Sequence, residues 1–141
     1  MLSFDESRWP LIVVTYPEDT TEAEFVEHLG KLSANIRRTA AAQSQTALIY
    51  DITSGYRAPA RVRQQQADWM KANASQIKGH CAGIAFVMTS SLVRGALTAI
   101  LWMSAMPTAY TVVATVAEAE SWCADRLREK GVSVPSQAKL G

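Results

Sequence analysis

TALIYDITSGYR, residues 46–57, is the stretch from which the fold can be worked out. A short apolar run ends at Asp51, and small hydroxylated residues, Gly55 and the pair Tyr56 and Arg57 follow it. The run predicts a β-strand, and the residues after it predict a loop. In an open α/β sheet, the loops at the carboxyl ends of the strands usually carry the function. We therefore expect this loop to form part of a recognition surface.

Strand-like and helix-like segments alternate on both sides of this stretch. Apolar runs predict strands over residues 2–4, 9–16, 47–52, 84–88 and 110–116. Apolar residues at helical spacing predict helices from residue 19 or 21 to about 41, and over 59–79, 92–105 and 117–130. Asp19 or Thr21 is expected to cap the first helix, with Glu22 or Glu24 completing a capping box. The first strand is expected to pair with the second through a turn at DESR, residues 5–8.

This order predicts an α/β fold, a single-domain sandwich over residues 1–131. Its sheet should be mostly parallel, with four to five strands, and about four helices should cover it. Residues 132–141 are polar and predict a flexible tail.

The composition fits one cytoplasmic domain. The chain has 141 residues, of which 48% are hydrophobic and 19% charged, enough for a core without metals or disulfides. Cys81 and Cys123 are too few and too far apart for a disulfide framework, so we expect reduced thiols. The N-terminus is acidic where a signal peptide needs basic residues. The most apolar stretch, residues 92–106, contains Arg94 and is shorter than the roughly 20 residues of a membrane span.

Charge is distributed unevenly along the chain. The net charge of +1 argues against nucleic acid as a partner. Residues 1–30 hold seven acids and one base, whereas residues 31–99 hold nine bases and two acids. Such asymmetry indicates either a docking face for an acidic partner or helix faces that pair with each other inside one domain.

Three segments resemble the STAS-like family of anti-sigma-factor antagonists, in its SpoIIAA-like branch. ALIYDIT is similar to the family's apolar strand that ends in Asp, an apolar residue and Ser or Thr. CAGIAFVMTSSLVRGAL resembles its central strand and third helix, and TVVATVAEAESWCADRL its last strand and helix. The resemblance implies a bacterial STAS-like domain that regulates other proteins by binding them.

One part of the family's pattern is missing. Antagonists of the switching type carry a phosphorylated serine in an Asp-Ser-Ser-Gly-like loop, where this chain has residues 56–59, YRAP, without a hydroxyl. Ser54 lies nearer the strand end and would be a shifted substitute. We therefore expect no phosphoserine switch.

No catalytic set is visible. His28 and His80 lie on different predicted elements, without other metal ligands at a suitable spacing. Neither cysteine lies in a nucleophile signature, and no glycine pattern would cradle a phosphate. We therefore expect no metal, no cofactor and no enzymatic activity.

The candidate binding residues cluster at the carboxyl ends of the predicted strands and on the helices that follow. A helix N-terminus, serine hydroxyls and Arg94 would form an anion-binding corner. Alternatively, Ser90 or Ser91 caps the helix and Arg94 pairs with Asp51. Ser54, Tyr56 and Arg57 are expected to be exposed contacts. The full set is Asp51, Thr53, Ser54, Tyr56, Arg57, Arg61, Ser90, Ser91, Arg94 and Trp102.

The helix predicted over residues 92–105 is apolar on more than one face. Either it is deeply buried, or its second face meets another copy of the chain, another protein or an apolar ligand. We predict a non-catalytic regulatory module that binds a partner protein, with a homodimer as one form. The alternative is a domain that binds a small molecule or lipid in an apolar pocket near this helix. A closed apolar pocket beneath the helix would favour the alternative, and a flat exposed patch the module.

Overall fold

The computed structural model describes residues 1–91, 94–95, 97–98, 101 and 105–134. Its strands are β1 (Ser3–Arg8), β2 (Leu11–Thr15), β3 (Thr46–Asp51), β4 (Cys81–Val87) and β5 (Tyr110–Val113). Helices whose bounds lie inside the described residues are α1 (Glu22–Ala41), α2 (Ala60–Ala72), α3 (Ala74–His80) and α5 (Val116–Glu129). The predicted α/β class and the single small domain are confirmed.

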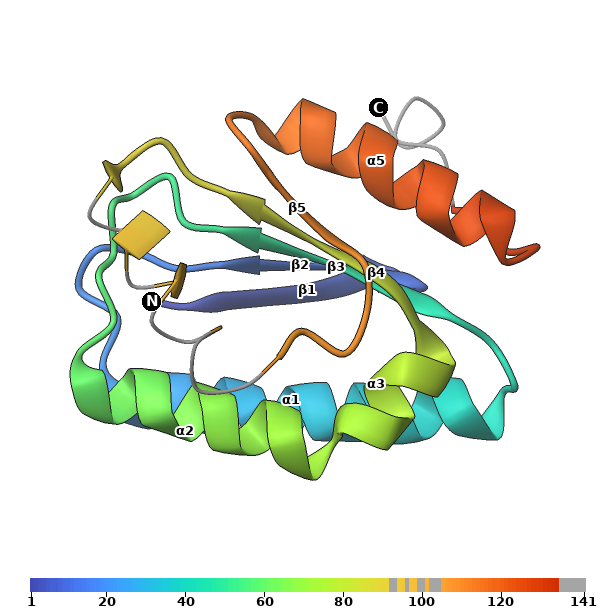
Figure 1. The fold of residues 1–141 in the computed structure, drawn as a ribbon, viewed down its shortest axis with the longest axis horizontal. Coiled ribbons are helices and arrows are strands. Elements are labelled where there is room, and N and C mark those ends of the chain that lie inside the picture. Colours follow the sequence, from blue (N-terminus) through green and yellow to red (C-terminus); the bar gives the residue numbers. More distant parts are fainter. Residues whose placement is uncertain (92–93, 96, 99–100, 102–104, 135–141) are drawn as a thin grey trace.

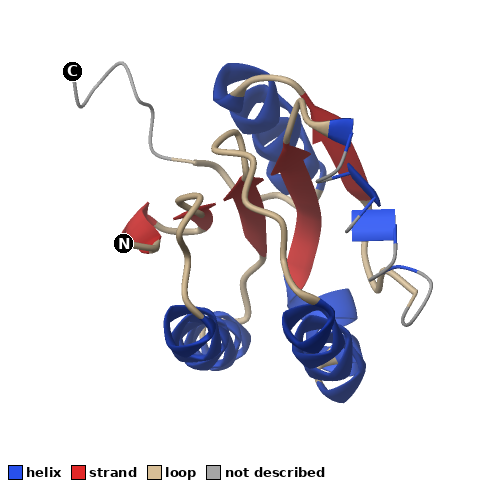
Figure 2. Cartoon of the chain, turned by 90° about the vertical axis from the view of Figure 1, so that its left-hand side faces the viewer, coloured by secondary structure: helices blue, strands red, loops and turns tan. Residues whose placement is uncertain are grey.

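The five strands form one sheet in the order β1-β2-β3-β4-β5. β1 pairs with β2 antiparallel, and every other neighbouring pair is parallel, so the sheet is mostly parallel as predicted. Helices α1, α2 and α3 cover one face of the sheet and α5 covers the other (Figure 1). Figure 2 shows the sheet between these two helical layers.

Side chains of the central strands alternate between the two faces, as the pleat requires. All seven residues of β4 are buried, which is typical of a strand covered on both sides. Large rings face the layer of α1 and α2, among them Tyr50 and Phe86. Small residues such as Ala47 and Ala85 face α5, where Cys123 and other buried residues of that helix pack.

The first helix begins at one of the two predicted caps. Thr21 is the N-cap, and its side chain accepts from the backbone N–H of Glu24 (3.1 Å). The Glu24 carboxylate accepts in return from the Thr21 N–H (3.1 Å), which completes the capping box. The same carboxylate accepts from the Leu2 N–H (2.8 Å). The start of β1 is therefore bound to the start of α1.

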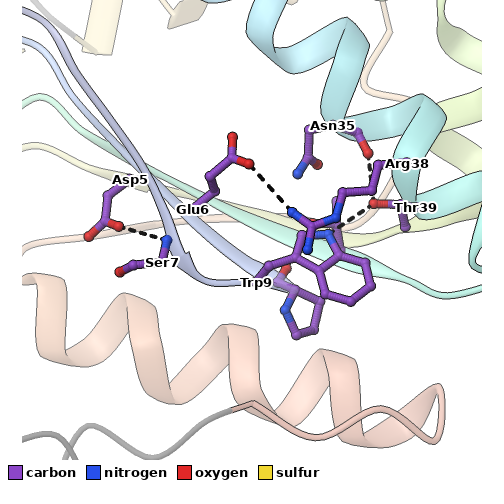
Figure 3. A network of polar contacts seen from close by, with 9 residues as sticks. Asp5, Glu6, Ser7, Trp9, Asn35, Arg38 and Thr39 are labelled. Atoms are coloured by element: carbon purple, nitrogen blue, oxygen red, sulfur yellow. Dashed lines mark hydrogen bonds and ion pairs between the residues drawn. The ribbon is translucent and has the colours of Figure 1, made fainter.

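The hairpin at the N-terminus differs from the prediction. Strand β1 runs through DESR, and the turn lies at Trp9 and Pro10, whose peptide bond is cis. The Trp9 indole donates to the Thr39 hydroxyl (3.3 Å), and the Arg38 guanidinium lies 4.5 Å from the ring centroid. Arg38 also pairs with Glu6 (3.4 Å), as Figure 3 shows. The contacts of an aromatic side chain with α1, and not a polar turn, set the end of this strand.

The helix predicted over residues 59–79 is two helices. Pro59 is the N-cap of α2, and the break falls at Asn73, whose backbone has φ −111°. The Asn73 side chain donates to the Trp69 carbonyl (2.9 Å), a local bond that competes with a regular helix.

The remaining differences concern the C-terminal third. Part of the helix predicted over residues 92–105, including Trp102, lies outside the described residues. Those of its residues that are described as helical are Arg94, Gly95, Leu97, Thr98 and Leu101. Residues 132–134 of the predicted tail follow α5 without regular structure, and Val132 and Val134 pack against the core cluster that contains residues of α5. The part of the tail from residue 135 onward lies outside the described residues.

Gly83 offers a test of the packing between β4 and α5. A Cβ at this position would lie 2.7 Å from two ring atoms of Trp122, whereas a Cβ at Gly30 in α1 would meet nothing within 4 Å. Gly83→Ala should lower the free energy of unfolding by about 1–3 kcal/mol through overpacking. Gly30→Ala should raise it by about 0.5–1 kcal/mol. Urea denaturation measures both, and equal stability of the two variants would contradict the close contact.

Candidate functional site

The carboxyl ends of the parallel strands meet at one edge of the sheet, as predicted. The Tyr16 N–H donates to the Asp51 carbonyl (3.0 Å), and the Ile52 N–H donates to the Val87 carbonyl (2.8 Å). The Met88 N–H donates in turn to the Val113 carbonyl (3.0 Å). These bonds continue the ladder just past the strand ends. The loops that follow β2, β3 and β4 therefore start side by side.

Hydroxyl groups in the loop after β3 hold that loop in place. The Asp51 carboxylate accepts from the Thr53 N–H (3.1 Å) and from its hydroxyl (2.7 Å). The Ser54 hydroxyl donates to the Tyr16 carbonyl and accepts from the Tyr56 N–H (3.2 Å). Gly55 has φ 84°, a backbone angle that residues other than glycine rarely adopt. Several of the polar groups predicted to bind a partner thus have bonds within the loop or to β2.

Tyr56 is not the exposed contact that was predicted. Its side chain turns into the core and is 8% exposed. Its ring stacks on that of Tyr16, with centroids 5.9 Å apart and planes 9° apart. The bonds of Ser54 to Tyr16 and Tyr56 direct the chain inward at this point. Arg57, the next residue, is exposed as expected.

An apolar pocket lies beneath this loop, between the sheet and α2. It is partly open to solvent, and its volume is about 70 Å³. Five aromatic rings line it, together with aliphatic and methionine side chains and one amide. The described lining residues are Tyr16, Phe25, Tyr50, Ile52, Tyr56, Ala58, Val62, Gln66, Met70, Phe86, Leu97 and Met106.

Tyr16 and His28 form a buried hydrogen-bonded pair at the wall of the pocket. The His28 Nδ1 lies 2.6 Å from the Phe25 carbonyl oxygen, which can only accept, so Nδ1 carries the proton. In the neutral ring, Nε2 is then an acceptor. The Tyr16 hydroxyl, 2.8 Å away, therefore donates to Nε2.

The titratable groups of this pair and of the pocket are held neutral. Burial lowers the pKa of His28 to about 4, against a smaller opposing effect of the bond to Phe25. Burial raises the pKa of the Tyr16 hydroxyl well above its ordinary value and raises those of Tyr50 and Tyr56 as well. At neutral pH the aromatic walls thus carry no charge.

The other predicted residues do not gather at this pocket. Arg61 pairs with Glu22 at the surface (3.2 Å), which links the starts of α2 and α1. Arg94 and Ser91 are exposed, and the Ser90 carbonyl accepts from the Arg94 N–H (3.1 Å). Both Asp51 and Arg94 are described, and no ion pair joins them.

Of the five aromatic rings of the pocket, only that of Tyr56 was among the binding residues predicted from the sequence. Tyr16, Tyr50 and Phe86 each stand at or near the end of a strand, and Tyr50 and Phe86 are register partners. Their rings lie side by side, with centroids 5.4 Å apart for Tyr50 and Phe86 and 5.9 Å for Tyr16 and Tyr50. The signal was an aromatic residue near the end of each of three successive strands.

Both cysteines are buried and unpaired, and burial raises the pKa of each thiol to about 12. Within the described part of the chain, no three His, Cys, Asp or Glu side chains lie together as metal ligands would. No helix in that part is long and apolar enough to cross a membrane.

No protein-family model and no curated protein sequence matches the chain.

His28 predicts a specific dependence of stability on pH. Its ordinary pKa of 6.5 applies to the unfolded chain and a pKa of about 4 to the folded protein. The contribution of His28 to the free energy of unfolding is therefore fully present above pH 6.5 and is lost as the pH falls toward 4. Its size is on the order of 3 kcal/mol. Urea denaturation at several pH values should show this loss for wild type and for His80→Gln. It should be much smaller for His28→Gln, and an unchanged loss in that variant would contradict the assignment.

Ser54 predicts a second effect on stability. Ser54→Ala removes the bonds to the Tyr16 carbonyl and the Tyr56 N–H. It should lower the free energy of unfolding by about 1–2 kcal/mol. The exposed Ser75 in α3 is the control, and Ser75→Ala should not destabilise. Thermal unfolding compares the two, and an unaffected Ser54→Ala protein would show that the hydroxyl does not hold the loop.

Proposed function

We propose that this domain binds a small apolar molecule in the pocket beneath the β3–α2 loop and does not transform it. The observation that carries this proposal is the lining of the pocket, which combines five aromatic rings with Met70 and Met106. Ligand sites are typically concave and apolar, with few polar groups. This pocket also lies at the carboxyl end of a parallel sheet, where open α/β folds bind their ligands.

The size of the pocket supports a ligand as its occupant. Protein interiors are close-packed and leave few voids larger than a water molecule. By the same measure of volume, one water needs about 10–15 Å³, and the pocket offers about 70 Å³. Its walls give water few hydrogen-bond partners. An apolar group fits this space better than water does.

The protonation states support binding without catalysis. Burial raises the pKa of the Tyr16, Tyr50 and Tyr56 hydroxyls, so none of them is an anionic nucleophile at neutral pH. The His28 Nε2 accepts a hydrogen bond from the Tyr16 hydroxyl and is not available as a base for a ligand.

Ligand binding was the alternative in the sequence-based prediction, and Leu97 and Met106 bring part of the third-helix region to the pocket. The regulatory interaction module stays a second candidate. It is favoured by Arg57 and Arg94, which are exposed at the carboxyl edge. The STAS-like resemblance, the homodimer and the cytoplasmic location stay predictions.

Filling the pocket should abolish binding. Ala58 lines the pocket and is half-buried in the loop, whereas Ala34 is exposed on α1. Toluene should shift amide NMR signals of the β3–α2 loop and of α2 in wild type and in Ala34→Phe. In Ala58→Phe these shifts should disappear because the new ring occupies the space, while the spectrum stays that of a folded protein.

Two results would contradict the proposal. One is a wild-type spectrum that toluene leaves unchanged up to its solubility limit. The other is binding of toluene to Ala58→Phe as tight as to wild type. For the second candidate, Arg57→Ala should weaken partner binding without changing the toluene titration.

A further inference from the structure

We infer that the ligand is a small neutral aromatic compound with one polar group, and that Gln66 recognises this polar group. The inference rests on the proposed function, because it names the class of molecule that would fill the pocket. It is drawn from three properties of the described lining: its charge, its rings and its single amide.

Charge is the first property. None of the described residues that line the pocket is charged. Burial favours the neutral forms of Tyr16 and Tyr50. A carboxylate or an ammonium group inside the pocket would lose its hydration without gaining a partner of opposite charge, which is costly. The buried part of the ligand is therefore neutral.

The rings are the second property. Tyr16, Tyr50 and Phe86 form a row along the sheet, and their neighbouring centroids lie 5.9 and 5.4 Å apart. Tyr56 and Phe25 extend the row, each stacked on Tyr16. Aromatic rings attract one another through stacked and edge-to-face contacts beyond the area that they bury. Walls of this kind favour a planar aromatic ligand over an alicyclic one of the same size.

Gln66 is the third property. It belongs to α2, where Val62, Gln66 and Met70 are spaced four residues apart and line the pocket together. The Gln66 amide lies close enough to the Tyr50 hydroxyl to act on its pKa, against the larger effect of burial. A primary amide offers two donors and two acceptor lone pairs, more than a single neighbouring hydroxyl can use, so it can also serve a ligand. Neighbouring Gln64, in contrast, is exposed and donates to Asp68 (2.8 Å).

A set of probes of similar size tests each property. Phenol carries a hydroxyl where toluene carries a methyl group, cyclohexanol lacks the aromatic ring, and benzoate and phenyltrimethylammonium carry opposite charges. NMR titration gives a Kd for each. We expect phenol to bind about threefold or more tighter than cyclohexanol. We expect the Kd of each ion to be higher than that of phenol by about tenfold or more.

Variants of Gln66 and Gln64 test the recognition of the polar group. Gln66→Leu should raise the Kd of phenol by about three- to tenfold, the loss expected for one hydrogen bond. It should leave the Kd of toluene unchanged. Toluene binding thereby reports that the variant is folded. Gln64→Leu should change neither Kd.

The outcomes separate this inference from the proposed function. If no probe binds, toluene included, the proposed function fails. If toluene binds but Gln66→Leu affects phenol no more than Gln64→Leu does, the role of Gln66 is wrong and the pocket stands. Benzoate or phenyltrimethylammonium binding more tightly than phenol would overturn the neutral class, and cyclohexanol binding as tightly as phenol would overturn the aromatic class.

Discussion

The contacts of Tyr16 join the sheet, the first helix and the loop after β3. Its N–H donates to the Asp51 carbonyl, its carbonyl accepts from Ser54, and its hydroxyl donates to His28. Its ring stacks on Tyr56. Each of these bonds forms only if the carboxyl ends of β2 and β3 lie level and α1 lies against them. Tyr16 therefore fixes the position of the pocket, because it joins the sheet and α1 to the loop after β3.

The difference between the two faces of the sheet explains why the pocket lies on one of them. On the α5 face, small residues such as Ala47 and Ala85 let the helix approach closely, and Trp122 lies directly against Gly83. On the other face, rings at Tyr50 and Phe86 hold α2 away from the sheet. A row of flat rings beneath a helix is harder to fill completely than a layer of alanines and branched side chains. The space is left at the loop end, where the rings are most numerous.

The sequence was sufficient for the fold because periodicity and length determine it. The uninterrupted apolar run of β4 and the helical spacing of α1 are local signals, and both elements were predicted. The bounds of α1 agree with the prediction, whereas β4 begins three residues before its predicted start. The wrong details depended on side-chain contacts. Trp9 ends β1 through its packing on α1, and its bond to Thr39 spans 30 residues, so no local pattern contains it. The break at Asn73 comes from a side-chain bond to the Trp69 carbonyl, one turn earlier in the same helix.

The apolar pocket lies at the edge of the sheet where the binding residues were predicted, but mostly other residues line it. Polar residues after a strand were interpreted as contacts for a partner, whereas Thr53 and Ser54 bond to Asp51, Tyr16 and Tyr56. A tight loop at the carboxyl end of a strand leaves backbone groups without ladder partners, and short hydroxylated side chains are well suited to satisfy them. The polar residues here thus serve the fold, and in doing so they turn Tyr56 inward. The apolar residues, usually assigned to the core, line the pocket that we propose as the binding site.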